Sequence, residues 1–150
     1  MKIKIMLIAL LLSACTSNEV AKLTFFDASL ESYTFSNVSE KLSHKYGYKI
    51  TPVIILMVSR DPKSEKASEQ LKILRDDGFI EENQILLIQS GGDEHHKGFY
   101  HLNIADSQRV LDRYDPEFNV FIISSKSKIL LQSQEPVSIN QIEKVLNSQI

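Results

Sequence analysis

Three of the four histidines lie close to two carboxylates, and this grouping could bind a metal ion. Asp93 and Glu94 are followed at once by His95 and His96, and His101 comes five residues later. Imidazole and carboxylate groups suit Zn²⁺, Cu²⁺ or Ni²⁺. Flanking glycines predict a loop, and adjacent side chains on an extended loop point to opposite sides. Two interpretations stay open, a metal site and a solvated polar loop, and we favour the solvated loop.

The only cysteine, Cys15, limits the thiol chemistry that the chain can perform. A single thiol excludes an intrachain disulfide, a Cys-x-x-Cys redox pair and cysteine-rich zinc or iron–sulfur sites. Before Cys15 come two basic residues, Lys2 and Lys4, and an apolar run over residues 5–12, as in a secretory signal. This run is far shorter than the roughly 20 residues needed to cross a bilayer. We therefore predict a cleaved leader over residues 1–14.

The sequence Leu12-Ser13-Ala14-Cys15 resembles the lipobox of bacterial lipoproteins. The resemblance implies cleavage before Cys15 and lipidation of its thiol, with several acyl chains, palmitate among them, holding the protein firmly at a membrane. Thr16, in place of Asp, resembles lipoproteins that are passed on to the outer membrane, which would place the domain in the periplasm of the cell envelope. The alternative is that Cys15 is an incidental residue after a simple secretory signal.

The charge balance excludes one class of partner. The 150 residues include 17 Lys and Arg against 19 Asp and Glu, for a formal net charge of −2, so we expect no nucleic acid partner. Loss of Lys2 and Lys4 with the leader leaves 15 of those 17 basic residues against the same 19 acidic ones. Because such a body is not drawn to anionic lipid, we expect the anchor to hold it at the membrane, with an envelope protein as a further candidate partner.

The chain divides into three parts by composition. We predict the leader over 1–14, the lipidated Cys15 with a flexible tether over 15–22, and one domain over 23–150 whose core covers about 51–150. The domain is long enough to bury a core without disulfides or metal.

The stretch before this core carries a short predicted strand at residues 23–26 and a helix. Val38, Leu42 and Tyr46 recur at helical spacing before Gly47. Aromatic residues are frequent here, and we expect most to belong to the core or to pack over a sheet edge; the alternative is that a few of them form a partner-binding face. They are Phe25, Phe26, Tyr33, Phe35, Tyr46 and Tyr48.

Two apolar runs without alternation, 53–58 and 85–88, predict strands that are buried on both faces. Between them, Asp61 and Pro62 predict the N-cap and first residue of a helix. A further helix is predicted near residues 106–114, before Asp115-Pro116.

The C-terminal part carries the clearest local signals. Residues 118–124 and 128–132 predict an antiparallel hairpin. Ser138 and Gln141 predict a capping box for the last helix, with Val137 and Ile142 as its hydrophobic staple. From residue 53 the order is β-α-β-α-β-β-α, which predicts an α/β fold of the thioredoxin-like type, with a mixed sheet and helices on both faces. A flavodoxin-like sheet would need another helix inside the hairpin turn, which is too short to hold one.

From residue 51 onward the chain resembles a family of secreted bacterial proteins with a thioredoxin-like fold, the domain-of-unknown-function family four-one-seven-four. The resemblance is carried by residues 118–123, Lys126 and Lys128 in the turn, and residues 130–133 and 135–138. The chain departs from that family in having Ser125-Lys126-Ser127-Lys128 where a Lys-Asp-Gly-type turn is usual. It also ends in Asn147-Ser148-Gln149-Ile150 where a Met-Pro-Met-like tail is usual, so the chain resembles a divergent member of the family.

Working thioredoxins carry Cys-x-x-Cys at the start of the helix after the first core strand, where the helix end lowers the pKa of the thiol. Here Pro62-Lys63-Ser64-Glu65 takes that place and has no sulfur. No His base lies near Ser64 in sequence, so we interpret its hydroxyl as a helix-terminal polar group and not as a nucleophile.

Thioredoxins also carry a cis-proline just before the hairpin strand. In this chain Phe118 and Asn119 precede Val120, and Pro116 lies too early to take that place. We therefore expect no oxidoreductase, isomerase or thiol peroxidase activity, no catalytic residue and no cofactor.

Our leading hypothesis is a non-catalytic, lipid-anchored envelope protein whose domain serves as a binding or accessory module. The alternative is a metal-binding or metal-handling lipoprotein that uses His95, His96 and His101 with Asp93 or Glu94. An unrecognised hydrolase comes third, because no nucleophile–base pair is visible in the sequence.

Overall fold

The structure is a computed structural model that describes residues 19–75, 78–90 and 100–148. The strands are β1 (Thr24–Phe26), β2 (Ser32–Thr34), β3 (Val53–Ser59), β4 (Ile85–Gln89), β5 (Tyr100–Leu102), β6 (Phe118–Ile123) and β7 (Ile129–Ser133). The helices are α2 (Val38–Tyr46), α3 (Glu65–Arg75), α4 (Phe79–Glu82), α5 (Ile104–Arg113) and α6 (Ile139–Asn147).

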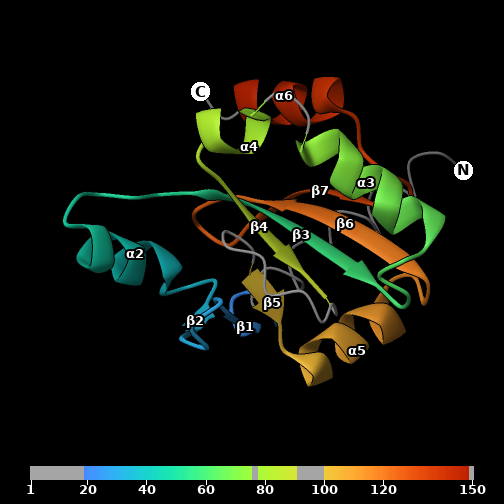
Figure 1. Ribbon diagram of the computed structural model, residues 1–150, viewed down its shortest axis with the longest axis horizontal. Coiled ribbons are helices and arrows are strands. Elements are labelled where there is room, and N and C mark those ends of the chain that lie inside the picture. Colours follow the sequence, from blue (N-terminus) through green and yellow to red (C-terminus); the bar gives the residue numbers. More distant parts are fainter. Residues whose placement is uncertain (1–18, 76–77, 91–99, 149–150) are drawn as a thin grey trace, which may run out of the picture.

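Across these residues the strands form one mixed sheet in the order β2-β1-β5-β4-β3-β6-β7 (Figure 1). Strand β4 pairs parallel with both β3 and β5, whereas β6 pairs antiparallel with β3 and with β7. Helices α3, α4 and α6 cover one face, and α2 and α5 lie on the other (Figure 1). The predicted α/β architecture, with a mixed sheet and helices on both faces, is therefore confirmed.

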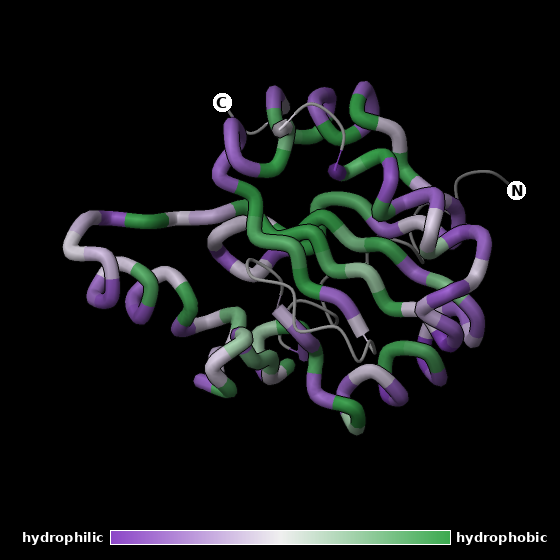
Figure 2. Tube along the Cα trace, in the orientation of Figure 1, coloured by the Kyte–Doolittle hydropathy of each residue, from purple (hydrophilic) through white to green (hydrophobic). Residues whose placement is uncertain are grey.

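Strand β3 has no exposed face. Ile54, Leu56 and Val58 belong to the hydrophobic cluster that includes side chains of α2 and α5. Ile55 and Met57 belong to the cluster on the α3 and α6 side. Figure 2 shows the resulting apolar centre, with polar residues along the helices and loops around it. A strand buried on both faces needs no polar alternation, which explains why its sequence has none.

Several local predictions are confirmed. Helix α2 ends at Gly47, whose φ of 75° lies in the left-handed region that glycine adopts without a Cβ penalty. Strands β6 and β7 form the predicted antiparallel hairpin. Ser138 and Gln141 form the full capping box of α6. The staple residues Val137 and Ile142 are both 1% exposed.

The predicted element order is wrong in detail because three short elements were missed. Strands β2 and β5 have three residues each and α4 has four, so none is long enough to show a periodicity. Strand β5 is defined by its pairing with β1 and β4, which no local pattern reveals. Helix α5 also begins earlier than predicted, because the Asn103 side chain accepts a hydrogen bond from the Ala105 N–H at 2.9 Å.

The flexible tether predicted over residues 15–22 is wrong for its last four residues. Val20 and Leu23 are 6% and 7% exposed and belong to the core, and a turn joins them through a Leu23 N–H to Val20 carbonyl hydrogen bond of 3.1 Å. Glu19 also pairs with Arg113 at the end of α5. Residues 19–22 therefore belong to the folded domain. The predicted leader and Cys15 lie outside the described residues.

Candidate functional site

The carboxyl ends of β3 and β4 meet the start of α3 at one edge of the sheet, the position expected for the missing redox motif. In open α/β sheets, ligands bind outside the carboxyl ends of the strands. Residues 61–64 fill this position, between the end of β3 at Ser59 and the start of α3 at Glu65.

The predicted start of this helix, at Asp61 and Pro62, is wrong. The Asp61 carboxylate accepts the Lys63 N–H at 2.9 Å and the Asp61 carbonyl accepts the Ser64 N–H at 3.0 Å, which closes a turn. Because its carboxylate is used within this turn, Asp61 does not cap the helix. Ser64 takes that role, since its Oγ accepts the Ala67 N–H at 3.3 Å and its carbonyl accepts the Ser68 N–H at 2.9 Å.

Three serine hydroxyls form hydrogen bonds with backbone groups at this edge. Ser59 Oγ donates to the Asp61 carbonyl at 2.6 Å and lies 3.3 Å from Ser64 Oγ. Ser90, at the end of β4, accepts the Ser59 N–H at 2.8 Å and donates to the Ser59 carbonyl at 3.1 Å. Each hydroxyl is thus used to hold backbone in place. This arrangement supports the interpretation of Ser64 as a capping residue.

The loop before β6 joins the same edge. Asp115 Oδ1 accepts the N–H groups of Glu117 at 2.9 Å and Phe118 at 3.1 Å, and these backbone hydrogen bonds lower the pKa of Asp115. Buried Asn119 closes the loop, with its Nδ2 donating to the Asp115 carbonyl at 2.7 Å. The Arg60 N–H donates to the Glu117 carbonyl at 3.0 Å, so this backbone acceptor is already occupied.

We name the outward side of this edge the α3 edge and define it by Arg60, Asp61, Pro62, Lys63 and Glu117, all of which are exposed. Arg60 and Glu117 form an ion pair at 3.4 Å across the two loops. Their backbones are held by the serine and Asp115 hydrogen bonds described above. The α3 edge therefore presents charges of both signs on a backbone that is fixed by hydrogen bonds. Such a surface suits recognition of a partner protein.

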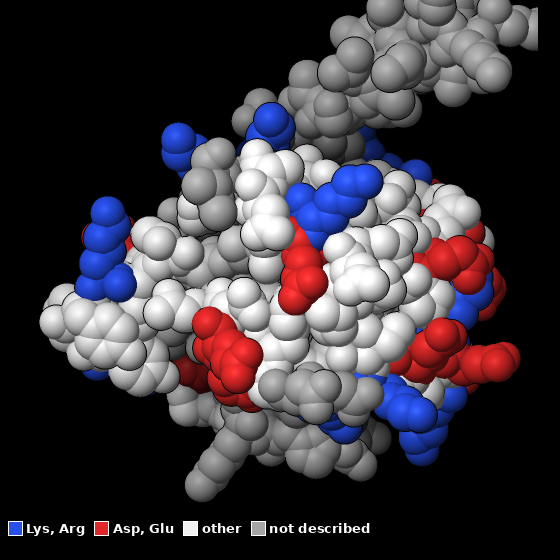
Figure 3. Space-filling view, turned by 90° about the horizontal axis from the view of Figure 1, so that it is seen from above, with Lys and Arg blue, Asp and Glu red and all other residues white. Residues whose placement is uncertain are grey.

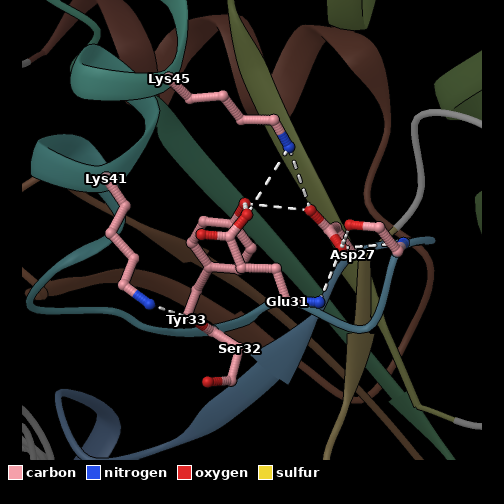
Figure 4. Close-up of polar contacts among 7 residues, drawn as sticks. Asp27, Glu31, Ser32, Tyr33, Lys41 and Lys45 are labelled. Atoms are coloured by element: carbon pink, nitrogen blue, oxygen red, sulfur yellow. Dashed lines mark hydrogen bonds and ion pairs between the residues drawn. The ribbon is translucent and has the colours of Figure 1, made fainter.

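A second polar cluster, which the sequence did not predict, links α2 to the β1–β2 hairpin (Figure 4). The Tyr33 hydroxyl lies 3.0 Å from both Asp27 Oδ2 and Glu31 Oε2, and Lys45 Nζ lies 3.3 Å from Asp27 Oδ2. Lys41 donates to the Ser32 carbonyl at 2.6 Å, and its ammonium lies 5.3 Å from the centre of the Tyr33 ring.

The pKa shifts in this cluster indicate a structural role. Burial raises the pKa of Asp27, but hydrogen bonds from Ser29, Glu31, Tyr33 and Lys45 outweigh it and lower that pKa to about 2. Burial and the two carboxylates raise the pKa of Tyr33, so its phenol stays protonated and serves as a donor. The hydrogen bond to Asp27 raises the pKa of Lys45. The only local signal for this cluster is Asp27 followed two residues later by Ser29, which is typical of an Asx turn.

The predicted metal ligands are tested only in part. Asp93, Glu94, His95 and His96 lie outside the described residues, and His101 is a half-buried residue of β5 that pairs in register with Phe26 and Gln89. Within the described residues, no group of three or more metal-ligating side chains comes together.

The aromatic residues of the N-terminal part divide between the core and the surface. Phe25, Tyr33 and Phe35 are buried, and the Phe25 ring stacks on Tyr33 with centroids 5.6 Å apart. Tyr46 and Tyr48 are 53% and 64% exposed. Three of the six aromatic residues are therefore core, Phe26 is half-buried, and Tyr46 and Tyr48 are exposed.

Comparison with known proteins shows the fold. No family model matches the chain, and no curated protein matches it. A thiol peroxidase from Chromobacterium violaceum has a TM-score of 0.55 at 10% identity, over 84% of this chain and 82% of that one. A conserved protein of unknown function from Bacteroides fragilis has a TM-score of 0.54 at 12% identity, over 85% of this chain and 95% of that one.

The pneumococcal exposed lipoprotein thioredoxin from Streptococcus pneumoniae has a TM-score of 0.51 at 13% identity, over 83% of this chain and 97% of that one. At these identities the likenesses concern the fold alone. The chain has a thioredoxin-like fold, as predicted, and membership of the four-one-seven-four family stays a prediction. In the described parts of the chain, every helix is too short or too polar to span a bilayer.

Proposed function

We propose that this protein is a lipid-anchored component of the bacterial cell envelope whose thioredoxin-like domain binds a partner protein and performs no thiol chemistry. One observation carries the proposal. The position of the redox motif holds a turn of residues 61–64, in which Ser64 caps α3 and no sulfur is present. Because Cys15 is the only cysteine, the folded domain has no thiol to exchange with a disulfide.

The anchor part of the proposal rests on the sequence. Leu12-Ser13-Ala14-Cys15 resembles a lipobox at the end of a short secretory leader. Thr16 after the cysteine favours the outer membrane, with the domain in the periplasm. The motifs of residues 118–138 make a divergent relative of the four-one-seven-four family the finer assignment that we propose.

The binding part of the proposal concerns the α3 edge. Its exposed side chains carry both signs of charge, with Arg60 and Lys63 beside Asp61 and Glu117. The hydrogen bonds of Ser59, Ser64 and Ser90 hold the backbone beneath them. Little backbone ordering is then needed on binding, which lowers the entropic cost of association. A protein surface with complementary charges is the partner that this edge fits.

The anchor is tested on full-length protein expressed in a bacterium. We expect mass spectrometry to show acyl chains on Cys15 and the protein to sediment with membranes. The Cys15→Ser variant should instead be released into the soluble fraction. An unmodified Cys15 in membrane-free protein would contradict the anchor.

The binding role is tested by photo-crosslinking in cells from an unnatural residue placed at position 63. We expect a specific adduct from that position and none from position 144, an exposed residue of α6. Arg60→Glu should weaken the adduct, and Lys144→Glu should leave it unchanged. Equal adducts from both positions, or reduction of disulfides by the purified protein, would contradict the proposal.

A further inference from the structure

The folded domain begins very close to the proposed lipid anchor, and the following inference rests on that proposed function. Val20 is buried in the core and Glu19 pairs with Arg113, so residues 15–18 alone separate the acylated thiol from the fold. An extended chain covers at most about 3.6 Å per residue, so the Cα atom of Glu19 lies within about 14 Å of that of Cys15. With Cys15 acylated as proposed, the surface around Glu19 therefore lies close to the bilayer.

This surface is hollowed. Residues 19–23 and helix α5 enclose a groove of about 590 Å³. Lys22, Arg109 and Arg113 supply cationic groups around it, and Glu19 and Asp112 supply carboxylates.

Both arginines of the groove form ion pairs with carboxylates of this chain. Arg109 pairs with Asp106, a residue that is 5% exposed, and Arg113 pairs with Glu19. Asp106 also accepts the Thr24 N–H at 2.8 Å, which ties the start of β1 to α5. The walls of the groove are thus joined to each other by long-range contacts.

The chemistry of the groove fits a phospholipid headgroup. Guanidinium and ammonium groups donate to phosphate oxygens, and carboxylates accept from the ammonium of a zwitterionic headgroup. The groove needs no net positive charge for this, which agrees with the acidic composition of the domain. The opposite face of the sheet, over α3 and α6, shows interspersed acidic and basic side chains (Figure 3).

We propose that the groove between residues 19–23 and α5 is the membrane-facing surface of the anchored domain and that phospholipid headgroups occupy it. Helices α3 and α6 then face away from the bilayer, because they cover the other side of the sheet from α5 (Figure 1).

The test uses the acylated full-length protein in vesicles of phosphatidylethanolamine and phosphatidylglycerol. Acylation blocks Cys15, so a cysteine introduced elsewhere takes a spin label alone. Asp112→Cys places the label in the groove, and Glu143→Cys places it on exposed α6 as a control that also loses one carboxylate. Collision with a water-soluble nickel chelate measures how far each label is shielded.

We expect the rate at which the chelate collides with the label at position 112 to be several-fold lower in vesicles than in detergent solution. The collision rate of the label at position 143 should be the same in both. A long Gly/Ser insert between Asn18 and Glu19 then removes the short tether. If headgroups bind the groove, shielding at 112 persists with the insert, is lost on adding Lys22→Glu, and is kept on adding Lys144→Glu.

Equal access of the chelate to both labels would overturn the inference. So would loss of shielding with the long tether alone, because proximity and not headgroup binding would then explain it. Mass spectrometry of the same samples shows whether Cys15 carries acyl chains. A missing acyl chain contradicts the proposed function together with this inference, whereas an acylated protein with an exposed label at 112 contradicts this inference only.

Discussion

The buried side chain of Gln70 in α3 makes hydrogen bonds to both backbone groups of Val137, the residue before the cap of α6. Gln70 Nε2 donates to the Val137 carbonyl at 3.1 Å, and Gln70 Oε1 accepts the Val137 N–H at 2.6 Å. Gln70 is 0% exposed and Val137 is 1% exposed. The amide therefore acts as a two-point clamp between the helices that cover one face of the sheet.

The clamp predicts a large loss of stability when its polar groups are removed. Gln70→Leu fills a similar volume but leaves the Val137 N–H and carbonyl without these partners, at about 1–3 kcal/mol for each unsatisfied buried group. We expect urea denaturation to show a loss within that range or above it. Glu69→Ala, at the exposed neighbouring position, should change stability by less than about 0.5 kcal/mol. Equal stability of both variants would show that the clamp contributes nothing.

The Asp27 cluster predicts a loss of stability in acid. The pKa of Asp27 is lowered from 3.8 to about 2 in the folded protein, so its contribution is fully present above about pH 4 and is lost as the pH falls through 2. Asp27→Asn should lower stability at neutral pH and flatten the pH dependence between 5 and 2 in urea denaturation. The exposed variant Glu40→Gln should keep the wild-type profile. A wild-type slope in Asp27→Asn would assign the acid sensitivity to other groups.

Ser64 is predicted to stabilise the start of α3 as its N-cap. Ser64→Ala removes the hydroxyl that accepts the Ala67 N–H and should cost about 1 kcal/mol, the usual value for a lost N-cap. Ser64→Asp restores an acceptor at the helix start and should recover most of that loss. The matched control is Ser68→Ala at an exposed position inside α3, where alanine is the better helix former. If thermal unfolding shows no difference between Ser64→Ala and Ser68→Ala, the capping role is wrong.

The histidine-containing loop is tested by thermal unfolding of chelated protein titrated with Zn²⁺, Cu²⁺ and Ni²⁺. A ligand that binds only the folded state raises stability by about 2.7 kcal/mol at a hundredfold excess over Kd. We expect no saturable shift, because we interpret the loop as solvated. A shift that disappears in a variant with His95, His96 and His101 replaced by Ala would establish the metal site instead. The His95→Ala/His96→Ala double variant controls for the loss of half-buried His101 from β5.

Short-range patterns predicted the elements that depend on neighbouring residues. The runs at 53–58 and 85–88 became buried strands, and the polar turn between β6 and β7 closed the predicted hairpin. The α6 capping box also formed as predicted, because Ser138 and Gln141 lie within one helical turn. Asp61 failed as a helix cap because its carboxylate bonds within a turn of the same few residues, and the two arrangements compete for one short segment.

By itself, the sequence determined that the folded domain has no thiol, and its periodicities determined most of the strands and helices. Only the tertiary structure decided the clamp between Gln70 and Val137, which are 67 residues apart, and the tie between Thr24 and Asp106, which are 82 apart. It also decided that Val20 belongs to the core. The physical reason is range: propensity and capping act over one turn, whereas these contacts exist only after the sheet has brought distant segments together.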